Sequence, residues 1–258
     1  SLIMKNYGDL NHKINFVQNL RSSEDYIYKH VLNVAILSAI IAGQMGFSVG
    51  RINLLVKSAI LHDIGALKLQ QLLDAEDLDD GTKEVVKKTT QETLARYGDW
   101  DEEVPRLITQ MQELYTSESD AEIPAALKES VNANILYVAD AYDRMTAMKS
   151  FEEPTSEVKA VRELLADEER YNKKIVNALI HGISILYPGV CVELTNGEKG
   201  LVVTENIFEP IVLDFRNNNL YDLSDPSVKQ TVEIADVMKT MDNRIKLDKN
   251  LLEEYQAN

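Results

Sequence analysis

The sequence predicts a mostly α-helical domain followed by a small antiparallel β meander. Apolar residues recur at helical spacing up to about residue 187. After Pro188 the pattern changes to short β-branched or aromatic runs between turn residues. We expect three parts: an N-terminal helix or linker over residues 1–22, a helical domain over residues 23–187, and the β meander with a C-terminal tail over residues 188–258.

The helices of the first part are bounded by capping residues and glycines. Ser22 or Ser23 can cap a helix that ends before Gly46, and Ser48 can cap a second one that ends near Gly65. Further helices are expected over residues 82–97, 101–115, 125–148, 154–165 and 171–186.

The meander is predicted from three runs over residues 190–194, 201–204 and 210–215. An Asn-Gly pair and three consecutive asparagines supply turns between and after these runs. The tail from about residue 226 is charged, and a short helix is expected over residues 249–255.

Composition restricts the partners of the chain. The net charge of −15 argues against a nucleic-acid polymer, because phosphate backbones need clustered cations. The longest apolar stretch, residues 34–43, is shorter than the ~20 residues of a membrane span, so none is expected. The single cysteine, Cys191, excludes an internal disulfide and favours a cytoplasmic location. The acidic residues 74–80 are expected to form a solvated loop.

Four polar side chains lie on apolar stripes of the predicted helices: His30, His62, Asp63 and Asp140. A buried carboxylate without a partner costs several kcal/mol, so the two aspartates need compensation. Either they pair with protonated histidines, or all four residues bind one cation. Two imidazoles and two carboxylates suit a divalent transition metal.

The same residues resemble a known family. LHDIG at residues 61–65, with His30 upstream and VADAYD at residues 138–143 downstream, is similar to the HD superfamily of metal-dependent phosphohydrolases. The resemblance implies one divalent transition metal (Fe, Mn, Ni, Co or Zn) on His30, His62, Asp63 and Asp140. It also implies that Asp63 takes part in catalysis as a ligand of the metal that activates water.

A longer likeness points to the HD-GYP branch, whose members hydrolyse cyclic di-GMP. Residues 133–151 resemble that branch around its last metal-binding aspartate, and residues 184–203 resemble a glycine-containing β segment that closes many of its members. The likeness covers roughly residues 23–215.

The chain departs from this branch at several positions. Thr89 stands where the branch has a histidine, Met111 and Gln112 replace a histidine pair, and only Glu113 of that run remains. Ala66 replaces a lysine, and the Gly-Tyr-Pro loop is absent. The ligands of a second and third metal are therefore missing, whereas those of a one-metal site remain.

A one-metal phosphohydrolase needs a protein cation to stabilise the charge that develops on the leaving group. Lys149 is our first candidate, because it occupies the place of a family arginine. Lys68 is the second candidate. The alternative for both lysines is an exposed, solubilising role.

Three functions follow as hypotheses. The first is a mononuclear phosphohydrolase that acts on a nucleotide or other phosphoester. The second is a catalytically degenerate HD-GYP-type signalling or scaffold module, with little or no cyclic di-GMP hydrolysis, that works with an upstream sensor domain or signalling partner. The third is a purely structural helical module with an empty site.

Overall fold

A computed structural model describes residues 25–69, 80–97, 102–116, 123–147, 154–204, 206 and 209–238. The predicted N-terminal helix, the acidic residues 74–79 and the predicted helix over residues 249–255 lie outside this part of the chain.

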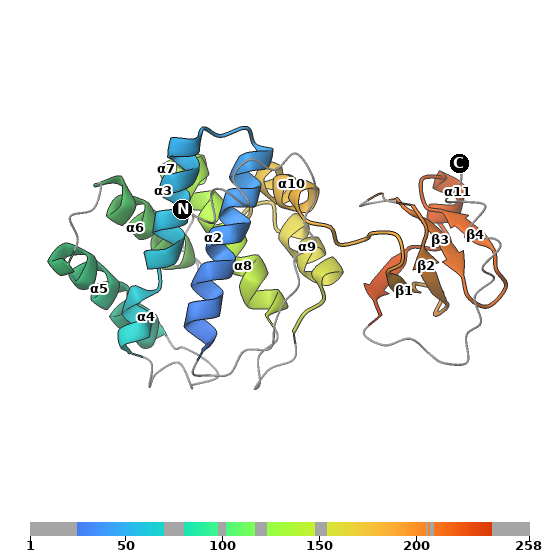
Figure 1. Cartoon of the computed structure of the whole chain (residues 1–258), viewed down its shortest axis with the longest axis horizontal. Helices are drawn as coiled ribbons and strands as arrows, with labels where there is room; N and C mark the ends of the chain where they lie inside the picture. The colour runs from blue at the N-terminus through green and yellow to red at the C-terminus, as the bar shows by residue number, and fades with distance from the viewer. Residues whose placement is uncertain are drawn as a thin grey trace. The chain divides into compact units, whose positions relative to one another are not determined.

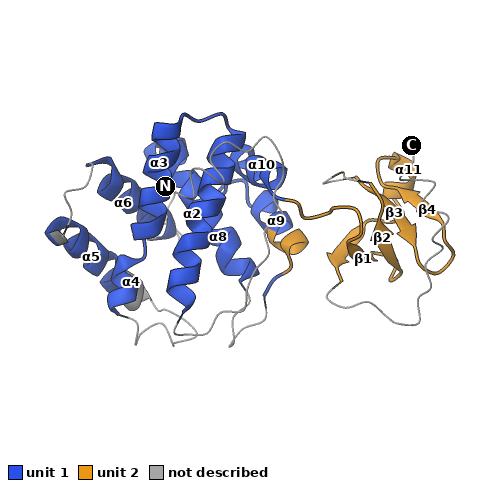
Figure 2. Ribbon diagram, in the orientation of Figure 1, with its two compact units in different colours: residues 1–155, 161–183 blue, residues 156–160, 184–258 orange. Residues whose placement is uncertain are grey.

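The chain forms two compact units (Figure 2). The first contains residues 1–155 and 161–183, and the second contains residues 156–160 and 184–258. Within the second unit, Lys159 Nζ lies 2.7 Å from a carboxylate oxygen of Asp236, which ties the short segment 156–160 to the sheet.

The first unit is helical, as predicted, and α2 lies at its centre (Figure 1). This helix packs against α3, α8 and α10. The helices are α2 (Tyr26–Gln44), α3 (Val49–Leu61), α4 (Ile64–Lys68), α5 (Asp80–Tyr97), α6 (Glu103–Thr116), α7 (Ala125–Glu129), α8 (Val131–Thr146) and α10 (Lys173–Gly182). A further helix, α9 (Glu157–Ala166), begins in residues of the second unit and ends in residues of the first.

The helix α2 is longer and more apolar than the stretch over residues 34–43 indicated. By length and composition alone, its 19 residues meet the requirement for crossing a membrane. Core helices meet the same requirement, and α2 has buried residues such as Val34, Leu37 and Ile41 packed inside the domain. Gly46, with φ of 71°, follows its C-terminus, as the sequence predicted.

Two predicted helices are each interrupted. The helix expected to end near Gly65 stops at Leu61 and restarts at Ile64, so that His62 and Asp63 lie at a break. The helix expected from residue 125 breaks at Ser130. There the Asn134 side chain donates hydrogen bonds to the main-chain carbonyls of Leu127, Lys128 and Ser130, around the start of the new helix.

The second unit is built on an antiparallel sheet with strand order β4-β3-β2-β1-β5. The three predicted strands are present, and two short strands extend the sheet. Gly197 and Asn218 have positive φ angles of 80° and 57° in the turns that the asparagine-rich segments predicted. The elements are β1 (Cys191–Leu194), β2 (Lys199–Val202), β3 (Ile211–Asp214), β4 (Leu220–Asp222), α11 (Pro226–Lys229) and β5 (Ile234–Val237).

Candidate metal centre

Three helical segments bring the predicted residues together. His30 lies on α2, His62 and Asp63 occupy the break between α3 and α4, and Asp140 lies on α8. We call these four residues the His–Asp cluster. One ligand atom each of His30, His62 and Asp140 lies within 4.8 Å of the others, so this trio could hold a metal ion. All three residues are buried.

The two imidazoles converge on a single oxygen. His30 Nε2 lies 2.8 Å from Asp140 Oδ1, and His62 Nε2 lies 3.1 Å from the same atom. The Oδ2 atom of Asp63 lies 3.6 Å from His30 Nε2 and 3.7 Å from His62 Nε2.

The far nitrogen of each ring is fixed by an acceptor. His30 Nδ1 lies 2.7 Å from Asp143 Oδ2, and Asp143 also accepts a hydrogen bond from the Asn33 amide at 2.9 Å. His62 Nδ1 lies 2.6 Å from the main-chain oxygen of Ala59, to which it donates. Metal-binding histidines have this arrangement, in which one nitrogen is held by a carboxylate or carbonyl and the other is directed at the metal.

The second oxygen of Asp140 is held separately from the first. Arg144 Nε donates a hydrogen bond to Asp140 Oδ2 at 2.7 Å, and the Tyr115 hydroxyl donates to the same oxygen. The Tyr115 ring packs edge-on against Tyr137, with centroids 4.6 Å apart. Asp140 is therefore oriented with Oδ1 toward the histidines and Oδ2 toward Arg144 and Tyr115.

Arg144 also reaches Asp63. Its Nη2 atom donates to Asp63 Oδ2 at 3.2 Å, so one guanidinium bridges the two carboxylates of the His–Asp cluster. Its side chain is 37% exposed, whereas that of Asp63 is 15% exposed and that of Asp140 is fully buried. Arg144 is thus the most exposed of these three side chains.

The charges in the cluster shift the pKa values of its members. Burial raises the pKa of Asp140, but Arg144 and His30 more than offset this and hold it well below its usual range. Burial likewise raises the pKa of Asp63, yet His62, Arg144 and His30 keep it below the ordinary value. Both carboxylates are therefore ionised at neutral pH.

The pKa of His30 shifts in the opposite direction. Burial and Arg144 lower the pKa of His30, but the charge of Asp140 and hydrogen bonds to Asp140 and Asp143 raise it to about 9. Both ring nitrogens face carboxylates, which an imidazolium satisfies by donating from each. In the metal-free protein His30 is a cation.

The distances in the cluster fit a metal. Metal–nitrogen and metal–oxygen bonds of about 2.1 Å place neighbouring ligand atoms roughly 3.0–3.4 Å apart. The contacts between imidazole nitrogens and carboxylate oxygens measure 2.8, 3.1, 3.6 and 3.7 Å. Asp63 is outside the trio whose ligand atoms lie within 4.8 Å of one another, so it would have to shift toward the trio to share its metal. Three carboxylates, including that of Asp143, lie around the two imidazoles and Arg144, so negative charge is available to compensate a divalent ion.

The structure describes only one of the two lysines predicted from the sequence. Lys149 lies outside the residues that the structure describes. Lys68 is exposed at the last residue of α4. The cation that contacts the carboxylates is Arg144, which the sequence reasoning missed, although its position four residues after Asp140 on a helix is the spacing of an ion pair.

The four positions that differ from the HD-GYP pattern lie on described helices: Ala66 on α4, Thr89 on α5, and Met111 and Gln112 on α6. Met111 is 2% exposed and belongs to the hydrophobic core. Thr89 lies on α5 and is partly buried, and its neighbour Thr90 is fully buried. Thr90 Oγ1 accepts a hydrogen bond from the Gly65 backbone at 3.1 Å, so this part of α5 supports the segment after the His-Asp doublet.

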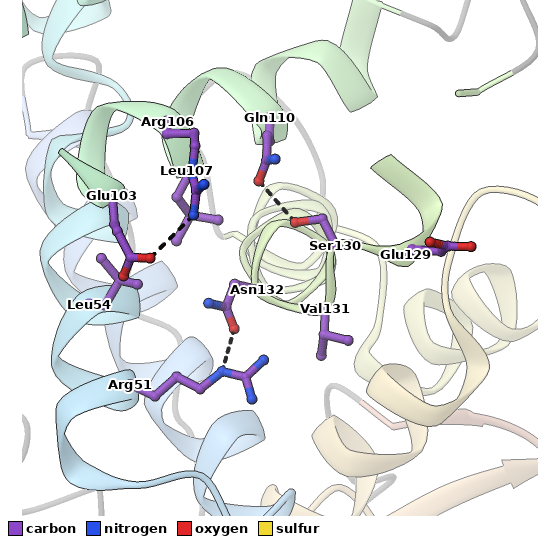
Figure 3. A pocket seen from close by; sticks show the side chains of 10 residues that line it. All are labelled: Arg51, Leu54, Glu103, Arg106, Leu107, Gln110, Glu129, Ser130, Val131 and Asn132. Atoms are coloured by element: carbon purple, nitrogen blue, oxygen red, sulfur yellow. Dashed lines mark hydrogen bonds and ion pairs between the residues drawn. The ribbon is translucent and has the colours of Figure 1, made fainter. Parts of the chain in front are cut away.

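A separate pocket of about 270 Å³ lies between α3, α6 and the break before α8 (Figure 3). Arg51 Nε donates to Asn132 Oδ1 at 2.8 Å, and Ser130 Oγ donates to Gln110 Oε1 at 2.9 Å across it. None of its lining residues belongs to the His–Asp cluster. Two arginines and two glutamates line it, so the net charge of the pocket favours neither an anionic nor a cationic ligand.

Comparison with known proteins agrees with the geometry. Residues 27–145 match the family model of the HD domain, and this range contains the whole His–Asp cluster. This segment therefore matches the HD domain that the sequence motif predicted.

The chain was also compared with curated proteins and with solved structures. No curated protein matches the chain. Among solved structures, the chain is similar to Bd1817, a HDG"Y"P protein from Bdellovibrio bacteriovorus, with 20% identity and a TM-score of 0.47. The match covers 63% of this chain and 53% of that one, so this chain spans about half the length of Bd1817.

Proposed function

We propose that the HD domain binds one divalent transition metal at His30, His62, Asp63 and Asp140 and hydrolyses a nucleotide or other phosphoester. One observation carries this proposal. The Nε2 atoms of both histidines converge on Asp140 Oδ1 while an acceptor holds each Nδ1 atom. A bound metal would polarise a phosphoryl oxygen and lower the pKa of water.

The donor set favours Fe, Mn, Ni, Co or Zn over Mg. Imidazole suits these transition metals, whereas Mg prefers oxygen ligands and retains its waters. Asp143 and the Ala59 carbonyl would hold the two rings in place during metal exchange, because they contact the nitrogens that do not face the metal.

The chain also supplies cations for an anionic ligand. Arg144 places a partly exposed guanidinium beside the cluster, and a guanidinium can bind two phosphoryl oxygens at once. Lys149 and Lys68 remain our sequence-based candidates for stabilising the leaving group. With these groups, a small phosphoester requires fewer contacts than a cyclic dinucleotide.

A second candidate is a catalytically degenerate HD-GYP-type signalling or scaffold module. Two observations favour it: Met111 is part of the core rather than a ligand, and Arg144 already neutralises charge between the carboxylates. Such a module would retain the fold and respond to an upstream sensor domain or signalling partner in the cytoplasm.

A hydrolysis panel separates these candidates. Metal-loaded protein is assayed for phosphate or nucleotide release from simple phosphoesters, mononucleotides and cyclic di-GMP. We expect activity on the first two classes and weak or no cyclic di-GMP hydrolysis. The activity should disappear in Asp63→Ala, fall in Lys149→Ala and persist in Arg106→Gln, which changes an exposed arginine on α6.

The outcomes differ for the two candidates. Rapid turnover of cyclic di-GMP would contradict the one-metal interpretation of the missing histidines. No hydrolysis of any substrate, with metal still bound, would favour the signalling module. Failure to bind any metal would contradict the metal centre itself.

A further inference from the structure

Arg144 and the predicted metal would use the same oxygen of Asp63. Asp63 Oδ2 faces both imidazoles, at 3.6 Å from His30 and 3.7 Å from His62. It is also the atom to which Arg144 Nη2 donates, at 3.2 Å. The guanidinium therefore occupies the oxygen that would complete the four-residue site.

Asp140 contacts the histidines and Arg144 through different oxygens. Its Oδ1 atom faces the histidines, and its Oδ2 atom accepts from Arg144 and from Tyr115. A metal on Oδ1 leaves the Oδ2 contacts in place. The conflict between arginine and metal is thus confined to Asp63, which is the ligand on the more exposed side of the cluster.

The fold allows Arg144 to leave Asp63. The side chain is 37% exposed, so its guanidinium can turn toward water without opening the core. Its position on α8, four residues after Asp140, keeps it beside the cluster in either arrangement.

We propose that Arg144 is a built-in competitor of the metal: it binds Asp63 in the empty site and makes metal binding weaker than the four ligands alone would give. This inference rests on the proposed metal centre and concerns its regulation. The arginine stabilises the empty cluster by pairing with two carboxylates, and its positive charge opposes a divalent cation nearby. Metal occupancy then depends on the free metal concentration rather than being permanent.

Substitution of Arg144 tests the proposal. Arg144→Gln removes the charge while Tyr115 still holds Asp140 Oδ2. Arg144→Lys keeps the charge as a point donor that cannot form the planar fork across both carboxylates. Arg106→Gln is the matched control, since Arg106 is an exposed arginine paired with Glu103 on the surface.

The measurements are Co²⁺ affinity, followed by the visible absorption of bound Co²⁺ in competition with a chelator, and the melting temperature of the metal-free protein. In Arg144→Gln we expect Co²⁺ to bind about tenfold tighter or more, the size of effect that outer groups have on metal sites. We also expect a lower melting temperature without metal. Arg144→Lys should lie between wild type and Arg144→Gln, and Arg106→Gln should match wild type.

Equal or weaker Co²⁺ binding by Arg144→Gln, with wild type binding normally, would overturn the competition and leave the metal centre intact. If Arg144→Gln does not fold, the same comparison is made with Arg144→Lys, and unchanged affinity there has the same meaning. Tight binding by Arg144→Gln alone, lost again when His62→Ala is added, would support the proposal in its strongest form. Failure of wild type and both variants to bind Co²⁺ would overturn the metal centre, and the competition with it.

Discussion

Raising the pH of the metal-free protein should deprotonate His30 and so remove its buried positive charge. His30 is fully buried, and its two nitrogens lie 2.7 Å from Asp143 and 2.8 Å from Asp140. The protonated ring donates to both carboxylates. When it loses its proton, one of these contacts becomes an approach of two acceptors in a site without solvent.

The magnitude follows from the pKa shift. The pKa of His30 is about 9 in the folded protein against an ordinary value of 6.5. At about 1.4 kcal/mol per pKa unit, the protonated ring contributes about 3 kcal/mol to the free energy of unfolding. Because the folded-state pKa is raised, this contribution is fully present below pH 6.5 and is lost as the pH rises through about 9. In a domain of this size, the loss lowers the melting temperature by about 6–12 °C.

The assay is urea unfolding in a chelating buffer between pH 6 and pH 10. We expect the free energy of unfolding to fall across this range in wild type and to change much less in His30→Gln, which cannot titrate. His181→Gln is the control, because His181 is an exposed histidine on α10 and should keep the wild-type slope. A flat wild-type profile, or an equal slope in His30→Gln, would refute the reasoning.

Further predictions concern the metal. Elemental analysis should find at most one transition-metal ion per chain; two at comparable occupancy would contradict the interpretation of Met111 and Gln112. Chelation should lower the melting temperature of metal-loaded protein by mass action, and His62→Ala should lose the difference between loaded and chelated samples. Asp143→Asn should weaken metal affinity about 10–100-fold by releasing the far nitrogen of a ligand, measured by metal titration; unchanged affinity would remove Asp143 from the site.

Much of the fold was predictable because its signals are local. The periodicity that predicted α2 reflects a helix with buried residues along most of its length, and Gly46 marks its end by a positive φ angle. The Asn-Gly pair ending in Gly197 marks a hairpin in the same way. By contrast, β5 (Ile234–Val237) pairs with β1, which is about 40 residues earlier, and nothing in its short sequence indicates that partner.

In the candidate site, too, the residues with a local sequence signal were predictable and those placed by packing were not. The burial of His30, His62 and Asp140 could be read from apolar stripes, because helical spacing fixes which residues share a face. Arg144 and Tyr115 could not be placed so easily. The Arg144 side chain is 37% exposed, as is ordinary for a surface arginine. Tyr115 comes from α6, whose approach to Asp140 depends on the packing of α6 against α8.

Just after the break at the His-Asp doublet, α4 makes a close contact that only glycine permits. A Cβ atom on Gly65 would lie 2.4 Å from both Thr90 Oγ1 and the Val86 carbonyl oxygen. Its absence lets α4 pack closely against α5, and the Gly65 amide donates to Thr90 Oγ1. This contact anchors the chain two residues after Asp63. Thr90, next to the position at which the sequence resemblance places a histidine, therefore supports the backbone that follows Asp63.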